Sequence, residues 1–445
     1  MTTPRTLDEW LRLLEVRHPV AIDLGLDRCR EVWRRMGSPR PARSLFLVAG
    51  TNGKGSTVAT ICGALGGLGY RYGSYTSPHL YRYNERILLQ GDEVSDALLL
   101  EAFERVEAAR GETSLSYFEF GTLAAFSILS RAALDFAVLE IGLGGRLDAV
   151  NLLDADCAVI TPIGLDHQEY LGSDLVVIGR EKAGIIRAGR PVICGEEHPP
   201  ASVLQTAEAL GAPVKRFGRE FRAVLRVGLR DGLRTGLHSG AEDAAVRFSA
   251  GDLALELPPP ALPGPHQLAN QATGVAAVLE LLPAAVTDLE GLRRGLRSVR
   301  LPGRFERVAE RPALWIDVGH NPLAARVVAA ALDELLSGGR IRRCRCVLAM
   351  LADKDAAGAV AELRGRVSAW YCAGTPGSRG LGAAPLAERI RGAAGDAPIR
   401  VFEAVSEALD AALADSQPED GVLVFGSFLT AADAGRYWRT RSQPA

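Results

Sequence analysis

Residues 45–57 read Leu-Phe-Leu-Val-Ala-Gly-Thr-Asn-Gly-Lys-Gly-Ser-Thr, an apolar run followed by a glycine-rich loop. The apolar residues predict a buried strand, and residues 57–68 predict a helix that begins as the loop ends. In such a unit the glycines let backbone N–H groups converge on phosphate oxygens, the helix N-terminus adds partial positive charge, and Lys54 supplies a point charge. The unit departs from the standard P-loop at Val48, where glycine is usual, and by the extra Gly55 between the lysine and the serine. We interpret it as a nucleotide phosphate loop, and a glycine-rich turn with a chance lysine is the structural alternative.

The identity of the nucleotide, ATP or GTP, follows from a guanine-binding motif that the sequence lacks. GTP-binding proteins with a P-loop also carry an Asn-Lys-x-Asp sequence that reads guanine, and this chain has none. We therefore expect ATP. A phosphate loop names no reaction, so the reaction class has to come from the residues around it.

The composition is that of a globular protein. The 445 residues suffice for two or three domains, and 47% apolar with 23% charged residues exclude a disordered chain. The net charge of −2 provides no field for nucleic acid or for an anionic membrane, so neither is an expected partner. The seven cysteines form no CxxC pair, and the chain shows neither a signal-like N-terminus nor an apolar run of about 18 residues. These features predict a cytoplasmic protein.

Apolar runs alternate with helical stretches over residues 44–210, which predicts a parallel sheet with helices on both faces. The pattern changes over 221–257 to short alternating segments, which predicts antiparallel strands beside the main sheet, and a helix is expected over 266–282. After a Leu-Pro-Gly-Arg sequence at 301–304 a second α/β series begins. The expected strands of both series are short and apolar. They are 45–49, 134–140 and 157–161 in the first series, and 314–317, 345–350, 369–372 and 422–425 in the second.

The fold class is therefore α/β in two parts. We place a P-loop parallel-sheet N-terminal ATPase domain at residues 1–299 and a smaller Rossmann-like α/β C-terminal domain at 300–445. Ligands are expected in the cleft between the two domains.

Polar side chains follow three of the expected strands. Ser77 comes after a strand at 72–76, Glu140 ends the strand before Ile141-Gly-Leu-Gly-Gly, and His167 lies just beyond the strand at 157–161. The carboxyl ends of parallel strands share one edge of a sheet, so these groups should lie near the phosphate loop. A hydroxyl, a carboxylate and an imidazole, together with water and ATP oxygens, predict a magnesium site, although each group taken alone also fits a structural role.

Two further segments predict functional turns. Gly179-Arg-Glu-Lys-Ala-Gly-Ile185 has the pattern of a helix start whose lysine lies among other ionisable groups, with a surface lysine as the alternative. Asp317-Val-Gly-His-Asn-Pro322 ends a strand and begins a helix. It is placed to contact a nucleotide or substrate from across the cleft. Capping by Asn321, with Pro322 in the first turn, is compatible with that role.

Taken together, these segments resemble the folylpolyglutamate synthase/dihydrofolate synthase family of the Mur ligase superfamily, in its bifunctional bacterial form. The resemblance runs from Ile22 to Ser427. Its motifs occur in one order: 50–56 Gly-Thr-Asn-Gly-Lys-Gly-Ser, 76–80 Thr-Ser-Pro-His-Leu, 117–122 Tyr-Phe-Glu-Phe-Gly-Thr, 142–149 Gly-Leu-Gly-Gly-Arg-Leu-Asp-Ala, 165–167 Leu-Asp-His, 179–184 Gly-Arg-Glu-Lys-Ala-Gly, 301–305 Leu-Pro-Gly-Arg-Phe, 317–322 Asp-Val-Gly-His-Asn-Pro and 353–355 Asp-Lys-Asp.

The resemblance implies a role for each matching residue. The implied ATP-binding residues are Thr51, Asn52, Gly53, Lys54, Gly55, Ser56, Asn270, Arg304 and Asp317. The implied magnesium ligands are Ser77, Glu140 and His167. Lys182 matches a lysine that is carbamylated in the family, where the anion supports a second metal ion. The implied pteroate-binding residues are Ile22, Asp23, Leu24, Ser116, Tyr117, Phe118, Glu119, Leu147, Asp148 and Ala149. His320 is placed near the transferred phosphate, so Lys54, Lys182 and His320 are the implied catalytic residues.

The implied reaction is amide ligation. The γ-phosphate of ATP passes to a substrate carboxylate, and the amine of L-glutamate then attacks the acyl phosphate and releases phosphate. The acceptor is dihydropteroate or a tetrahydrofolate polyglutamate, the metal is Mg²⁺ (two ions), and the family is monomeric. Lysine and magnesium help because activating a carboxylate requires charge to be neutralised on the transferring phosphoryl group.

Other readings of the sequence remain open at this point. A monofunctional folylpolyglutamate synthase and a Mur-type cell-wall amino-acid ligase would use the same ATP machinery. A P-loop ATPase switch would form no covalent product, and a small-molecule kinase would need no amine. Product analysis with and without glutamate separates these readings.

Overall fold

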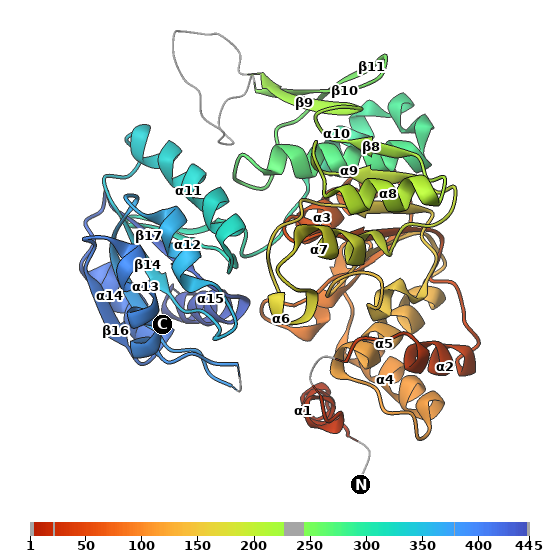
Figure 1. The fold of residues 1–445 in the computed structure, drawn as a ribbon, viewed down its shortest axis with the longest axis horizontal. Helices are drawn as coiled ribbons and strands as arrows, with labels where there is room; N and C mark the ends of the chain where they lie inside the picture. The colour runs from red at the N-terminus through yellow and green to blue at the C-terminus, as the bar shows by residue number, and fades with distance from the viewer. Residues whose placement is uncertain (1–3, 21–22, 227–243, 378, 443–445) are drawn as a thin grey trace.

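The computed structural model describes residues 4–20, 23–226, 244–377 and 379–442. It consists of two α/β bodies that lie side by side (Figure 1). The N-terminal body holds an eight-stranded sheet and a small three-stranded sheet, and the C-terminal body holds a six-stranded sheet. The expected α/β fold with a parallel N-terminal sheet and a separate C-terminal α/β domain is confirmed.

The large N-terminal sheet has the strand order β4-β3-β2-β5-β1-β6-β7-β8. Its strands are β1 (Ala42–Ala49), β2 (Tyr72–Tyr75), β3 (Ile87–Leu89), β4 (Asp92–Glu93), β5 (Leu134–Glu140), β6 (Cys157–Ile160), β7 (Val192–Cys194) and β8 (Val214–Arg216). From β2 across to β8 all pairings are parallel, whereas β3 and β4 pair antiparallel at the edge. The loops after β1, β2, β5 and β6 therefore meet at one end of the sheet, around the phosphate loop.

Ten α-helices accompany the two N-terminal sheets within the described residues: α1 (Leu7–Arg17), α2 (Asp27–Arg35), α3 (Lys54–Gly67), α4 (Asp96–Arg110), α5 (Tyr117–Arg131), α6 (Gln168–Leu171), α7 (Leu175–Ala183), α8 (Ala201–Ala209), α9 (Gln267–Leu281) and α10 (Leu289–Arg297). The alternation of side chains along β1 shows that the helices cover both faces of the large sheet. Leu45 and Leu47 join one buried cluster with residues of α1, α2, α4 and α5, and Phe46 and Val48 join another with residues of α3, α9 and α10. Burying each such side chain stabilises the fold by about 1.5–3 kcal/mol.

The small sheet is antiparallel, in the order β11-β10-β9, and covers residues expected to form short strands. Its strands are β9 (Phe221–Arg226), β10 (Ala245–Ala250) and β11 (Leu253–Leu257). Their inward residues, including Phe221 and Phe248, pack into the same core as α9.

The C-terminal sheet has the order β12-β13-β17-β14-β15-β16, with β12 antiparallel at the edge and the other pairings parallel. Its elements are β12 (Glu306–Glu310), β13 (Ala313–Ile316), α11 (Pro322–Ser337), β14 (Cys344–Leu348), α12 (Ala356–Leu363), β15 (Val367–Ala373), α13 (Ala383–Ala394), β16 (Ile399–Phe402), α14 (Val405–Ala414), β17 (Gly421–Phe425) and α15 (Phe428–Ser442). Helices α11 to α13 cover one face, and α14 and α15 cover the other. The expected boundary at 299/300 falls between α10 and β12 and stays a prediction.

One local expectation is wrong. Residues 179–185 do not start a helix, because α7 begins at Leu175 and ends at Ala183, which puts Lys182 in its last turn. Asp174 caps the helix earlier by accepting a hydrogen bond from the backbone N–H of Val176, at 2.7 Å. The expected helix start after Asp317 is confirmed: Asn321 caps α11 and Pro322 occupies its first turn.

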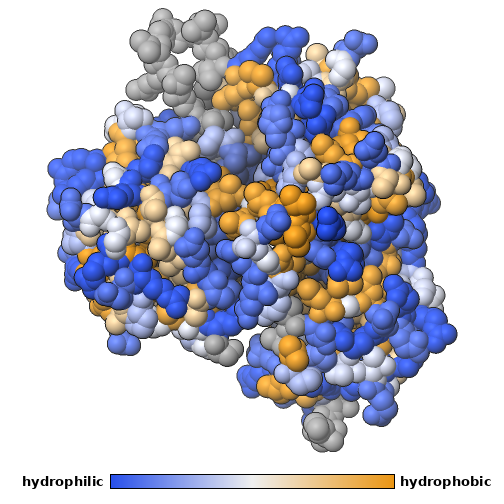
Figure 2. Space-filling model, in the orientation of Figure 1, coloured by the Kyte–Doolittle hydropathy of each residue, from blue (hydrophilic) through white to orange (hydrophobic). Residues whose placement is uncertain are grey.

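The surface is mainly polar in the view of Figure 2, and apolar residues gather near its centre. Large exposed apolar residues occur around α6 and α7, including Leu165, Tyr170 and Leu175. Among the described residues, no helix has both the length and the apolar character needed to cross a membrane.

Candidate active site

Two glycines give the phosphate loop its shape. Gly50 has φ +148°, and a Cβ added there would lie 1.9 Å from Oγ1 of Thr161. Gly53 has φ +88°, and its Cβ would lie 2.5 Å from Oδ1 of Asn270. Gly53 is also the N-cap of α3, so the first-turn N–H groups of this helix, which lack intrahelical acceptors, lie at the loop. A larger residue at either position would displace the loop.

The other loop residues are tied to their surroundings. The Thr51 hydroxyl donates to the carbonyl of Gly164 and accepts from its N–H, both at 3.0 Å. Lys54 folds over its own loop, with Nζ 3.2 Å from the Gly50 carbonyl oxygen and 3.1 Å from that of Thr51. The Ser56 hydroxyl accepts from the Gln267 side chain at 3.3 Å. The loop is therefore held in shape by the protein itself.

The three expected metal ligands line one cavity together with residues 50–56. Glu140 ends β5 and is 6% exposed, and its carboxylate accepts one long hydrogen bond, 3.3 Å from the Ser77 backbone N–H. Burial raises the pKa of the Glu140 carboxyl, against the charges of Lys54 and Arg304. Burial also lowers the pKa of His167 to about 4, so its ring is neutral at physiological pH, the form that binds metals.

This donor set fits a divalent cation. A buried carboxylate with one weak donor has free lone pairs, and a cation would offset its desolvation. No group of three or more His, Cys, Asp or Glu side chains is placed for metal binding in the described ranges, so an ion here would also take ligands from the Ser77 hydroxyl and from nucleotide oxygens.

Lys182 lies at the wall of the same cavity and is 4% exposed. Its Nζ donates to the carbonyl oxygen of Gly50 at 2.8 Å. Burial, with the charge of Lys54 added, lowers the pKa of Lys182 to about 7. A neutral amine is the form that reacts with carbon dioxide, so this environment favours carbamylation.

The other expected nucleotide-binding residues are Asn270, on α9 of the N-terminal domain, and Arg304 and Asp317 of the C-terminal domain. Asn270 is buried on α9 beneath Gly53 and donates to the Gln267 side chain at 3.0 Å. Arg304 lines the cavity with its guanidinium 5.2 Å from the ring centroid of Phe428. Asp317 also lines the cavity, and it accepts backbone N–H groups of Phe305 (2.8 Å) and Gly319 (2.7 Å). The cleft is thus walled by both domains.

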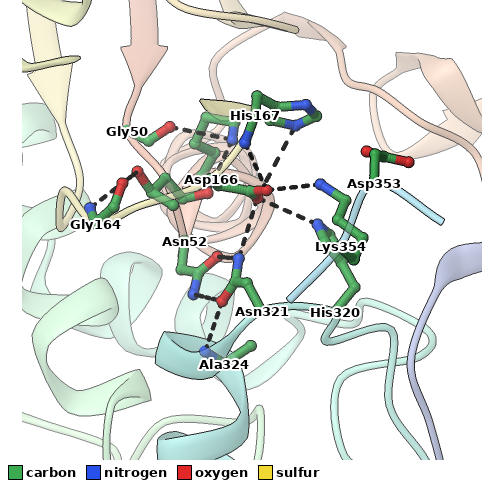
Figure 3. A network of polar contacts seen from close by, with 12 residues as sticks. Gly50, Asn52, Gly164, Asp166, His167, His320, Asn321, Ala324, Asp353 and Lys354 are labelled. Carbon is green, nitrogen blue, oxygen red and sulfur yellow. Dashed lines mark hydrogen bonds and ion pairs between the residues drawn. The ribbon is translucent and has the colours of Figure 1, made fainter. Parts of the chain in front are cut away.

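His320 reaches the N-terminal domain through Asp166. Its Nε2 lies 3.3 Å from Oδ2 of Asp166 (Figure 3). Its Nδ1 lies 3.0 Å from the carbonyl oxygen of Val318. The side-chain amides of Asn52 and Asn321 pair nearby at 3.1 and 3.2 Å. His320 thereby lines the same cavity as Lys54 and Lys182.

The expected pteroate-binding residues form a neighbouring cluster. Arg28, on α2, bridges two of them, with Nη1 2.8 Å from Oδ2 of Asp23 and Nη2 2.9 Å from Oε1 of Glu119. Ser116 and Glu119 form a capping box at the start of α5. Asp23 is not buried, because its side chain is 35% exposed, but it has partners in Arg28 and in His18, at 3.2 Å. Ile22 lies outside the described residues.

The remaining members of the cluster surround the loop after β5. The Phe118 ring packs against Gly142, and Tyr117 is half-buried with the Arg86 guanidinium 5.5 Å from its ring centroid. Asp148 accepts backbone N–H groups of Leu143 (2.8 Å) and Val150 (2.9 Å), so it shapes the loop. Leu24 and Leu147 are half-buried, Ala149 is buried, and Phe120, next to Glu119, is a core residue. Gly142 and Leu143 also line the main cavity, so the two regions adjoin.

Sequence reasoning missed Arg28, Lys354 and the role of Asp166. Arg28 had no motif of its own, and a charged residue at a helix start is usually solvated. Lys354, in an Asp-Lys-Asp sequence, contacts Asp166 at 2.6 Å. A lysine that is 8% exposed in a chain of ordinary composition needs a partner, and that signal becomes visible only once burial is known.

Comparisons with known proteins match nearly the whole chain. The family described as Mur ligase, glutamate ligase domain, matches residues 303–428. Dihydrofolate synthase/folylpolyglutamate synthase of Escherichia coli K12 is 42% identical over 431 residues, which are 96% of this chain and 94% of that protein. The structure of Escherichia coli FolC in complex with DHPP and ADP has a TM-score of 0.87 and 40% identity and covers 99% of this chain and 100% of that one. A bifunctional folylpolyglutamate synthase/dihydrofolate synthase with manganese, AMPPNP and L-glutamate bound has a TM-score of 0.84 and 40% identity, covering 98% of both chains.

Proposed function

The chain belongs to the dihydrofolate synthase/folylpolyglutamate synthase family, and on this premise we propose that it is an ATP-dependent ligase that joins L-glutamate to dihydropteroate and to tetrahydrofolate polyglutamates. The relatives' printed names and ligands support ATP-dependent glutamate ligation in folate metabolism. ADP and phosphate are the other products.

One observation carries the proposal. The phosphate loop, Glu140 and Lys182 of the N-terminal domain line a single cavity with Arg304 and His320 of the C-terminal domain. Cationic groups from two domains around a phosphate loop suit transfer of a phosphoryl group to a carboxylate, because negative charge accumulates on the transferring group. A P-loop switch or a simple ATPase has no need of this second set of residues.

The chemistry follows from this placement. A carboxylate oxygen of the acceptor attacks the γ-phosphorus of ATP, the bond to the β,γ-bridging oxygen breaks, and ADP leaves. The glutamate amine then attacks the carbonyl carbon of the acyl phosphate, which forms the amide C–N bond and breaks the C–O bond to phosphate, and the amine loses a proton. Lys54 and Arg304 neutralise charge at the phosphates, and His320 faces the transferred group. The cleft between the domains keeps water from the acyl phosphate.

A divalent metal belongs to the proposal. Ser77, Glu140 and His167 would hold Mg²⁺, and carbamylated Lys182 would support a second ion. The metal would supply positive charge to the ATP oxygens.

The proposal also covers the cellular compartment and the oligomeric state. The seven cysteines are free and buried, which suits a reducing compartment, and we assign a cytoplasmic monomer. The substrates are small molecules, with no nucleic-acid or membrane partner.

Product analysis tests the function. The protein is incubated with Mg²⁺, ATP, L-glutamate and either dihydropteroate or tetrahydrofolate, and the products are identified by mass spectrometry. We expect dihydrofolate from the first acceptor and glutamate-extended folates from the second, with ADP release that depends on glutamate. Extension of tetrahydrofolate alone would indicate the monofunctional enzyme, and a stable phosphorylated product formed without glutamate would indicate a kinase.

A further inference from the structure

Asp166 receives polar groups from three residues of the C-terminal domain. Its Oδ1 lies 2.6 Å from Nζ of Lys354, and its Oδ2 accepts from the Asn321 amide at 3.1 Å and lies 3.3 Å from Nε2 of His320 (Figure 3). On the N-terminal side, the His167 backbone N–H donates to Oδ1 at 2.8 Å. Both carboxylate oxygens are therefore engaged across the domain boundary.

The Asp166–Lys354 pair is shielded from water. The two side chains are 10% and 5% exposed. The two opposite charges meet at 2.6 Å, so each compensates the other's removal from water. A buried ion pair costs desolvation energy and adds little net stability, whereas removing one partner leaves an uncompensated charge. Such a pair is suited to fixing a geometry.

The contacts of Asp166 hold His320 and Asn321 in position beside the cavity. His320 is held at both ring nitrogens, by Asp166 and by the Val318 carbonyl, so its ring cannot turn freely. Asn321 is the N-cap of α11 and pairs with Asn52 of the phosphate loop. One carboxylate thus fixes His320, the start of α11 and the Lys354 loop against the N-terminal domain.

A second contact between the domains, which is called the second bracket below, joins Tyr81 to α15. Arg436 donates to the Tyr81 carbonyl at 3.2 Å, and the Arg439 guanidinium lies 3.6 Å from the centroid of the Tyr81 ring. These residues do not line the cavity. Changing this contact therefore tests the effect of weakening an interdomain contact that does not involve the cavity.

We propose that Asp166 is a positioning residue that clamps His320, Asn321 and Lys354 of the C-terminal domain against the phosphate loop, and so keeps the cleft closed around the acyl phosphate. The inference rests on the proposed function. Asp166 itself lines the cavity, and the inference assigns it the positioning of the C-terminal residues, through which it would control how phosphate transfer is coupled to amide formation.

The test uses Asp166→Asn, which keeps the shape but cannot neutralise Lys354, and Lys354→Met, which removes the other partner. Two matched controls are Asp353→Asn, which alters the same loop but pairs with Arg379, and Arg436→Gln, which weakens the second bracket. Amide formation and phosphate release are measured in the same assay. We expect Asp166→Asn and Lys354→Met to lower kcat for amide formation at least about tenfold. We also expect phosphate released per amide formed to rise above the wild-type ratio, because water reaches the acyl phosphate.

Domain spacing is measured independently in the full-length protein. The exposed residues Leu210 and Val401 lie one in each domain, and the native cysteines are buried, so Leu210→Cys and Val401→Cys allow paired spin labels. With a non-hydrolysable ATP analogue bound, the distance distribution should lengthen or broaden in Asp166→Asn and in Lys354→Met and stay unchanged in Asp353→Asn. Arg436→Gln, which weakens a domain contact away from the cavity, should leave the ratio of phosphate to amide unchanged.

The outcomes separate the two proposals. An unchanged phosphate-to-amide ratio and an unchanged distance distribution in both test variants would overturn the clamp, as would equal effects of all four substitutions. If Asp166→Asn does not fold, as judged by circular dichroism, Lys354→Met carries the same test. A wild-type protein without glutamate ligation would refute the proposed function, and the distance measurement would still decide the clamp.

Discussion

Nζ of Lys182 lies 2.8 Å from the carbonyl oxygen of Gly50, the residue that begins the phosphate loop. A lysine in the last turn of α7 is thereby brought to the loop that follows β1, 132 residues earlier in the chain. The contact places a buried amine of lowered pKa beside the site where phosphates are expected.

We expect Lys182 to be carbamylated. Protein equilibrated with ¹³C-bicarbonate should give a carbamate signal by NMR that is missing from Lys182→Ala and retained in Lys215→Ala, the matched change at a lysine whose side chain is 49% exposed. Lys182→Ala should lose nearly all ligase activity, and a small added carboxylate should restore part of it. A fully active Lys182→Ala variant would refute the role.

The carbamate should depend on pH with a definite sign. The folded-state pKa of Lys182 is lowered from 10.5 to about 7, so the amine is neutral above about pH 7 and protonated below it. Because the neutral amine reacts, carbamylation at fixed carbon dioxide should fall as the pH drops through about 7. Reactivation of decarbamylated protein, followed by activity across this range, checks the sign, and a flat profile would contradict it.

Glu140 should control the affinity for the metal. Glu140→Gln removes the charge of a buried carboxylate without changing its size, so the Mg²⁺ concentration for half-maximal activity should rise about tenfold or more. Chelation of divalent ions should abolish wild-type turnover, and added Mg²⁺ or Mn²⁺ should restore it. An unchanged Mg²⁺ requirement in the variant would remove Glu140 from the metal site.

Lys54 should act on the phosphoryl group. Lys54→Ala should lower kcat by about 100-fold to 1,000-fold, because a charge aimed at the transferring group is lost, while the melting temperature stays near that of the wild type. Steady-state ADP release and thermal unfolding measure the two effects. Near-normal turnover would exclude the phosphate-loop assignment of this lysine.

Substitution of Asp23 should affect the reactions of the two acceptors, dihydropteroate and tetrahydrofolate, unequally. Since Arg28 links it to Glu119, Asp23→Ala should depress glutamylation of dihydropteroate more than that of tetrahydrofolate. Asp27→Ala is the matched control, because the Asp27 side chain is fully exposed and pairs with Arg30. Ratios of kcat/KM for the two acceptors provide the measurement. Equal losses on both would assign Asp23 a structural role.

The sequence by itself determined the local elements and their order. The strand before residue 50, the helix after it and the cap at Asn321 depend on residues a few positions apart, so periodicity and capping rules suffice. The meeting of Ser77, Glu140 and His167 also followed, because parallel strands bring their carboxyl ends to one edge. The misplaced start of α7 arose within the same short range, where Asp174 outweighs the Gly179 segment.

Only the tertiary structure decided which distant charges meet. Asp166 and Lys354 are 188 residues apart, and Arg28 and Glu119 are 91 apart. Their pairing depends on how two α/β bodies dock and how α2 lies on α5, which is the sum of many packing contacts and leaves no period in the sequence. Burial, too, is a property of the folded chain, and it lowers the pKa of Lys182 to about 7.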